Sequence, residues 1–209
     1  MMCNYKKLFE ELLTSRNGIE VDSIHFVSDE IYVKDEREKL SYIGLESYEP
    51  IYFSNKELQY PPKMGLKSLS NMRGATICIR NDSKIKQVIF LPKDVAIIGT
   101  NLHADSYEEL KSLFQLCSLL HELGHVEDMQ KSINFSLGDK PTIQLLKAEA
   151  YAHAYALNFL NQAGATIARN MLADALYKLN QSNRKFDKNL YQQISVSIGK
   201  GRLKKWMKA

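Results

Sequence analysis

The sequence predicts an α+β fold that is mainly helical, with a small antiparallel sheet packed beside one long buried helix. Residues 106–120 contain no glycine or proline and repeat leucine and other apolar residues at helical spacing. Residues 75–80 and 87–91 are rich in β-forming residues, and the segment Asn81-Asp82-Ser83-Lys84 between them predicts a hairpin turn. The chain has 209 residues, 44% of them hydrophobic, which suffices for one compact domain.

The N-terminal third predicts a helix, short strands and a long loop. Asn4 can cap a helix that extends to about Arg16 and ends at an Asn-Gly pair. β-forming residues suggest short strands between residues 21 and 33, and residues 35–47 predict a charged helix. Residues 54–74 contain two prolines and two glycines and are expected to form the loop.

The long helix carries the most informative side chains. Ser106, with Glu109 three residues later, predicts the capping box at which this helix begins. Two rows of apolar residues cover much of its circumference, so the helix is expected to be buried. His121 and His125 extend one of these rows, and buried imidazoles need partners.

His121-Glu122-Leu123-Gly124-His125 is an H-E-x-x-H motif. Residues four apart lie on one face of a helix, so both imidazoles can reach the same metal ion. Glu122 lies beside them, where it can act as general base on a water molecule. Two histidines, one further protein ligand and one open position form the pattern of a catalytic zinc site.

The third ligand is expected from the next helix. Asp139-Lys140-Pro141 predicts the start of that helix and Gly164 its end. Glu149 lies on its apolar face, where a carboxylate is costly unless it is paired or bound to a metal. Alternate alanines around Glu149 would let this helix approach a neighbour closely. His121, His125 and Glu149 are therefore the predicted ligands of one Zn²⁺ ion per chain, although the same donors also accept Mn, Fe, Co or Ni.

Other side chains near these ligands have two interpretations each. His153 is a candidate catalytic residue that would polarise the substrate or orient a ligand; alternatively, it is a buried histidine with a backbone partner. Tyr151 and Tyr155 could stabilise an oxyanion or could simply pack on the alanine-rich helix. Asp128 is expected at the end of the motif helix rather than among the ligands.

The HELGH sequence, followed by a helix that carries Glu149-Ala150 and further alanines, resembles the ImmA/IrrE-type metallopeptidase family. The resemblance covers residues 75–165 and implies a zincin-like core of the gluzincin type. It also implies that the two motif histidines and Glu149 hold zinc, with Glu122 as the general base. An asparagine and an aromatic residue are commoner in the family where this chain has Tyr151 and His153.

Together these features predict a zinc-dependent peptidase. The resemblance implies that its substrate is one specific intracellular protein, such as a transcriptional repressor. The alternative is a non-catalytic zinc-binding interaction protein of a phage or mobile element, in which zinc only joins two helices. Hairpin 75–91 is expected to supply or adjoin a sheet edge at which an extended peptide could bind. Otherwise, this hairpin would merely close the core.

Composition favours a cytoplasmic protein. The N-terminus has no apolar stretch long enough for a signal peptide, and no segment has the length needed to cross a membrane. The three cysteines are odd in number and widely separated, which argues against a disulfide framework. Cys117 is expected to be a small buried hydrophobic residue.

The C-terminal part, residues 166–209, predicts two helices at 166–179 and 187–198 and a basic tail. Residues 200–209 contain five basic and no acidic residues, so the rest of the chain is almost neutral although the net charge is +4. The tail could bind nucleic acid or an anionic surface, or it could be a solvated terminal helix or a frayed end. Outside the tail, the balance of acidic and basic residues argues against a dedicated nucleic-acid-binding protein.

Overall fold

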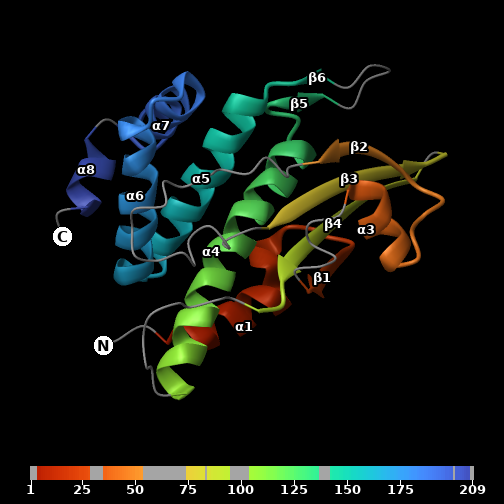
Figure 1. Ribbon diagram of the computed structural model, residues 1–209, viewed down its shortest axis with the longest axis horizontal. Helices are drawn as coiled ribbons and strands as arrows, with labels where there is room; N and C mark the ends of the chain where they lie inside the picture. Colours follow the sequence, from red (N-terminus) through yellow and green to blue (C-terminus); the bar gives the residue numbers. More distant parts are fainter. Residues whose placement is uncertain are drawn as a thin grey trace.

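A computed structural model describes residues 4–28, 35–53, 74–82, 84–94, 104–136, 142–199 and 201–207. Their central element is the long helix α4, which packs against α5 on one side and against α1, β3 and β4 on the other (Figure 1). The helices are α1 (Tyr5–Ser15), the 3-10 helix η1 (Arg16–Gly18), α3 (Glu36–Tyr42), α4 (Ala104–Gln130), α5 (Leu145–Gln162), α6 (Thr166–Gln181), α7 (Lys185–Ser197) and α8 (Arg202–Met207). The strands are β1 (Ser23–Val27), β2 (Glu49–Phe53), β3 (Ala75–Asn81), β4 (Lys84–Pro92), β5 (Phe135–Ser136) and β6 (Thr142–Ile143). The predicted class, α+β and mainly helical, is confirmed.

The main sheet has the strand order β1-β4-β3-β2 and is mixed. β3 is antiparallel to both β2 and β4, as predicted for the 75–91 hairpin, but β1 runs parallel to β4. The prediction of an antiparallel sheet is therefore wrong for β1. The physical reason is the helix α3 between β1 and β2, which returns the chain so that both strands run in the same direction.

Alternate residues of the central strands face two separate cores, as the two-residue period of a strand requires. Cys78 of β3 lies in the large core that includes α4 and the C-terminal helices. Ile77 and Ile79 lie in a second core on the opposite face, together with Leu40 of α3. Since helices cover both faces, β3 is apolar throughout its centre, and the same alternation directs Thr76 towards α4.

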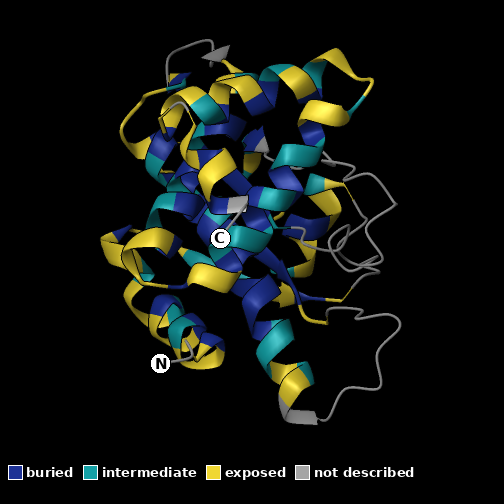
Figure 2. Cartoon of the chain, turned by 90° about the vertical axis from the view of Figure 1, so that its left-hand side faces the viewer, coloured by how far each residue is buried: buried dark blue, intermediate teal, exposed yellow. Residues whose placement is uncertain are grey.

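Helix α4 is exposed or half-buried from Ser106 to Lys111 and mostly buried from Ser112 onwards, which Figure 2 shows as a change from yellow and teal to blue. It begins at Ala104, so the predicted capping box is wrong and Ser106 lies inside the helix. The Glu109 carboxylate instead accepts a hydrogen bond of 3.0 Å from the backbone N–H of Tyr5, at the start of α1. Glu109 therefore caps a different helix, whose first backbone N–H groups would otherwise have no intrahelical acceptor.

Two N-terminal helices agree in part with the prediction. Asn4 caps α1, since its side chain accepts a hydrogen bond from the N–H of Lys7 at 2.7 Å. Helix α3 ends at Tyr42, five residues before the predicted end, because Gly44 adopts a φ of 72° and closes the helix. The predicted strand residues 31–33 and the predicted loop, apart from Gly74, lie outside the described residues.

The boundaries of α5 to α7 follow from turns and from one small hairpin. Helix α5 begins at Leu145 rather than at the predicted start near residue 141, because Ile143 pairs with Phe135 in the β5-β6 hairpin. It ends before Gly164, as predicted, where φ is 68°. Helices α6 and α7 match the predicted C-terminal helices to within two residues at each end.

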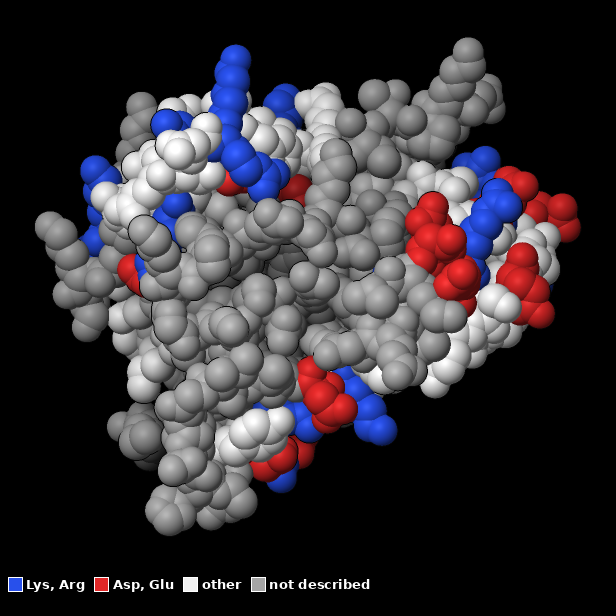
Figure 3. Space-filling view, viewed as in Figure 1, with Lys and Arg blue, Asp and Glu red and all other residues white. Residues whose placement is uncertain are grey.

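The basic tail forms a packed helix, α8, rather than a frayed end. Its Leu203 and Trp206 are buried, and the Arg169 guanidinium of α6 lies 5.1 Å from the centre of the Trp206 ring. Lys200 and Lys208 lie outside the described residues. On the face shown in Figure 3, the described basic side chains gather mainly over the C-terminal helices and the acidic ones over the end that carries α3. Nucleic-acid binding by the tail stays a prediction.

Cys78 and Cys117 are both buried. Cys117 is buried in the large core, where burial raises the pKa of its thiol to about 12, so its interpretation as a small hydrophobic residue is confirmed. Cys3 lies outside the described residues. In the part of the chain that the structure describes, no helix combines the length and the apolar character needed to span a bilayer.

Gly124 allows α4 and α5 to approach each other closely. A Cβ atom added at this position would lie 2.7 Å from the Cα of Ala152 and 3.1 Å from its carbonyl oxygen. Alanine is the better helix former by about 1 kcal/mol, but overpacking costs about 1–3 kcal/mol. Since the contact is with backbone, we expect Gly124→Ala to lower the free energy of unfolding by about 1–2 kcal/mol in a urea titration. A stabilised variant would contradict this close approach.

Candidate metal centre

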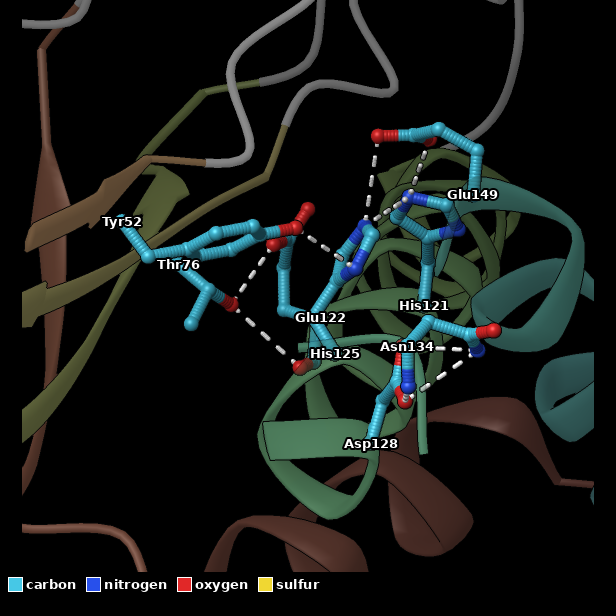
Figure 4. Close-up of polar contacts among 8 residues, drawn as sticks. All are labelled: Tyr52, Thr76, His121, Glu122, His125, Asp128, Asn134 and Glu149. Carbon is cyan, nitrogen blue, oxygen red and sulfur yellow. Dashed lines mark hydrogen bonds and ion pairs between the residues drawn. The ribbon is translucent and has the colours of Figure 1, made fainter. Parts of the chain in front are cut away.

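The structure brings the three predicted ligands together (Figure 4). His121 and His125 lie one turn apart on α4, and their Nε2 atoms are 3.1 Å from each other. Glu149 of α5 faces both: one carboxylate oxygen lies 3.5 Å from Nε2 of His121, and the other lies 3.5 Å from Nε2 of His125. The side chains of His125 and Glu149 are almost completely buried. A local motif on one helix is thus completed by a residue from the next.

These spacings fit a metal ion. Zinc binds histidine nitrogen at about 2.0–2.1 Å, so two ligand atoms of a tetrahedral site are separated by about 3.3 Å. The three observed separations, from 3.1 to 3.5 Å, lie around this value. These separations are therefore compatible with three ligands around one metal ion.

The electrostatic environment favours a cation at this centre. Burial lowers the pKa of His125 to about 4, against the opposing effect of the Glu149 charge, so His125 is neutral at pH 7. For His121, burial also lowers the pKa, but the hydrogen bond to Glu149 and the charges of Glu122 and Glu149 outweigh it and raise the pKa overall. A positive charge is thus stabilised beside the carboxylates, and a metal ion can take the place of the proton.

Tyr52 of β2 orients one of the two histidines. Its hydroxyl lies 3.1 Å from Nδ1 of His125, and its ring is buried against Phe135. Burial, together with the negative charges of Glu149 and Glu122, raises the pKa of Tyr52, so its phenol stays protonated. A partner on Nδ1 leaves Nε2 available to a metal, which is the usual outer-shell arrangement of a histidine ligand.

Glu122 is buried beside His121, His125 and Glu149, on the side that faces the sheet. Its carboxylate accepts a hydrogen bond of 2.7 Å from Oγ1 of Thr76 on β3, and the same hydroxyl lies 3.3 Å from the Glu122 carbonyl oxygen. A Cβ atom at Gly74, just before β3, would collide with the Glu122 side chain. Thr76 and Gly74 therefore fix the position of the predicted general base.

His153 lies beside His121 and Glu149, one turn after Glu149 on α5. Its ring centre is 4.3 Å from that of His121, and ligand atoms of His121, Glu149 and His153 all lie within 4.8 Å of one another. Burial and the nearby histidines lower the pKa of His153 well below its ordinary value. Among the described residues neither ring nitrogen of His153 has a hydrogen-bond partner, so the predicted backbone partner is not found. An unsatisfied buried donor costs about 1–3 kcal/mol.

The two tyrosines of α5 form hydrogen bonds with residues other than His121, His125 and Glu149. Tyr151 donates a hydrogen bond of 2.6 Å to the carboxylate of Glu127, and Tyr155 accepts one of 2.7 Å from the side chain of Asn17. Both side chains line a cavity on the far side of α5 from the histidines. Their oxyanion role is therefore not supported, and the packing interpretation describes them better.

Asp128 lies at the end of α4, as predicted. Its carboxylate accepts hydrogen bonds from the backbone N–H of Asn134 at 2.8 Å and from the Asn134 side chain (Figure 4). Burial raises its pKa, and these hydrogen bonds only partly oppose the effect. The carboxylate thus closes the turn after α4 through Asn134 rather than joining His121, His125 and Glu149.

The 75–91 hairpin lies inside the main sheet rather than at its edge. β3 is paired with β2 and β4, and β4 is paired with β1 and β3, so the 75–91 hairpin has no free edge of its own. Within the described ranges the hairpin adjoins β2, which pairs with β3 alone. β2 also carries Tyr52, so the strand at this edge contacts His125 directly.

Comparison of the chain with protein-family models finds no match, and comparisons with curated proteins and with solved structures also find none. The resemblance to the ImmA/IrrE-type family therefore stays a prediction.

Tyr52 offers a test of this geometry that does not depend on catalysis. Tyr52→Phe removes the hydroxyl at Nδ1 of His125 and keeps the ring, and loss of an outer-shell partner weakens metal binding by about 10–100-fold. We expect the zinc dissociation constant, measured by competition with a chromophoric chelator, to rise by about 10-fold. Tyr177→Phe, on α6, is the matched control and should leave it unchanged. Equal affinities in the two variants would show that Tyr52 does not orient His125.

Proposed function

We propose that this chain is a zinc-dependent peptidase with a zincin-like site similar to that of the ImmA/IrrE-type family. One observation carries the proposal: the two histidines of an H-E-x-x-H helix face a buried glutamate of the next helix at ligand spacing. The glutamate of the motif, Glu122, is buried beside them. A purely structural site would need only the metal ligands, whereas a hydrolytic site also needs a base.

Each residue then has a definite role. His121, His125 and Glu149 would hold the ion, a donor set that suits zinc and leaves one position open. Zinc, when bound, would polarise the scissile carbonyl and lower the pKa of a water molecule. Glu122 accepts the proton of the attacking water and passes it to the leaving amine.

Glu122 is held for this role from the sheet. The hydroxyl of Thr76 donates a hydrogen bond to one carboxylate oxygen of Glu122 and so holds the carboxylate against β3. The absence of a side chain at Gly74 provides the space in which the carboxylate lies. Positioning from a rigid strand is what a proton acceptor requires, because proton transfer depends on hydrogen-bond distance.

The substrate we propose is an extended segment of a specific protein, such as a transcriptional repressor, bound beside β2. A strand that pairs on one side can add a peptide through backbone hydrogen bonds. β2 joins this edge to the metal cluster through Tyr52 and His125. The repressor itself comes from the family resemblance alone.

The proposal is tested with the purified full-length chain. Metal content is measured first, and the zinc-loaded chain is then incubated with a mixture of protein-derived peptides whose products are identified by mass spectrometry. Cleavage that a chelator abolishes and zinc restores would support a peptidase. One bound zinc per chain without any cleavage would favour the alternative, a non-catalytic zinc-binding interaction protein. A chain that binds no zinc would overturn both.

A further inference from the structure

We propose that His153 is a fourth protein ligand of the metal ion held by His121, His125 and Glu149. This inference rests on the proposed metal site and adds a ligand that the H-E-x-x-H arrangement does not require. The resulting donor set consists of three imidazoles and one carboxylate, from two neighbouring helices.

The placement of His153 follows from the geometry of α5. Residues four apart lie on the same face of a helix, so Glu149 and His153 both face α4. The His153 ring lies next to the ring of His121, with 4.3 Å between centres, and the ligand atoms of His121, Glu149 and His153 lie within 4.8 Å of one another. Ligand atoms around tetrahedral zinc are separated by about 3.3 Å. The ligand atoms of His121, Glu149 and His153 therefore need to approach one another by at most about 1.5 Å.

The environment of His153 also indicates a ligand. Its side chain is 3% exposed, and in the described part of the chain no hydrogen bond reaches either of its ring nitrogens. Phenylalanine would fill the same space in the core without a polar atom. An imidazole there carries a lone pair next to two other metal-binding groups, and imidazole is a preferred zinc ligand.

A fourth protein ligand changes how the proposed peptidase would work. Zinc with four protein ligands has the coordination of a structural site, whereas a catalytic site keeps one position open. His153 would occupy that position in the resting chain and would have to leave it for turnover. The site would thus be closed until a substrate or partner displaces one imidazole.

The number of bound imidazoles can be counted directly. The full-length chain, with histidine labelled by ¹⁵N, is loaded with ¹¹³Cd, and spin coupling between ¹¹³Cd and ring nitrogens is recorded by nuclear magnetic resonance. We expect three of the five histidines to show coupling in the wild type. His153→Phe should leave two coupled histidines and weaken zinc binding by roughly 100-fold. This loss corresponds to about one quarter of the free energy with which four ligands bind zinc.

The assignment does not depend on that variant folding. His25→Gln and His103→Gln should each keep three coupled histidines, which leaves His153 as the third by elimination. Two coupled histidines in the wild type, unchanged in His153→Phe, would overturn the four-ligand site and leave the proposed three-ligand site intact. The absence of coupling at every histidine would instead overturn the metal centre itself, and with it the proposed function.

Discussion

Replacement of Glu122 by glutamine is expected to lower the rate of peptide hydrolysis by about 10²- to 10⁴-fold, the usual contribution of general acid–base catalysis. The amide has nearly the same shape as the carboxylate and can still accept a hydrogen bond from Thr76. It cannot accept the proton of the attacking water. Zinc should stay bound, because Glu122 is beside the ligands rather than one of them.

The measurement compares kcat/KM and metal content for the wild type and Glu122→Gln. Glu127→Gln is a matched control, since Glu127 lies on the same helix but bonds to Lys131 and Tyr151, away from the histidines. The control should retain wild-type activity. Equal loss in both variants would point to damage to α4, and full activity in Glu122→Gln would show that another group is the base.

A loss of stability in Glu122→Gln can be distinguished from the loss of the general base. A buried carboxylate is costly to desolvate, and a neutral amide of equal size avoids that cost. The replacement also creates no uncompensated charge. We therefore expect the melting temperature of metal-free Glu122→Gln to be no lower than that of the wild type. A loss of activity at preserved stability then reports on chemistry.

The helical part of this site could be predicted from the sequence because its geometry is local. The i, i+4 spacing of His121 and His125 fixes their common face without knowledge of the rest of the fold. Glu149 could be predicted because a carboxylate on an apolar helix face requires a partner. The approach of the two helices was also foreseeable from small residues, and it depends on Gly124 against Ala152.

The contributions of the sheet could not be predicted in the same way. Tyr52 lies on β2, a five-residue strand with a proline at its second position and an irregular register opposite β3. Such a strand has little signal of its own, since strand formation depends on packing and pairing with distant segments. Thr76 was within a predicted strand, but its contact with Glu122 depends on which face of β3 meets α4. Glu109 is the opposite case. Its spacing from Ser106 predicts a local capping box, but its carboxylate accepts a hydrogen bond from the distant Tyr5.

Removal of Glu149 is expected to weaken zinc binding by about 100-fold or more, because one of few protein ligands and the negative charge of the site are lost. The effect can be read without a substrate from the change in melting temperature on addition of zinc. A ligand present at 1,000 times its dissociation constant stabilises the native state by about 4 kcal/mol. For a chain of this size, 1 kcal/mol corresponds to about 2–4 °C, so the wild type should melt about 8–16 °C higher with zinc.

Glu149→Ala should lose most of this shift, whereas Glu108→Ala, an exposed position on α4, should keep it in full. The metal-free variant need not be greatly destabilised, because His121 can become neutral once its acidic partner is gone and no buried charge is left uncompensated. A small change without zinc and a large loss of the zinc-induced shift together identify Glu149 as a ligand. If the shift is unchanged, another group completes the site, and His153 is the imidazole already beside it.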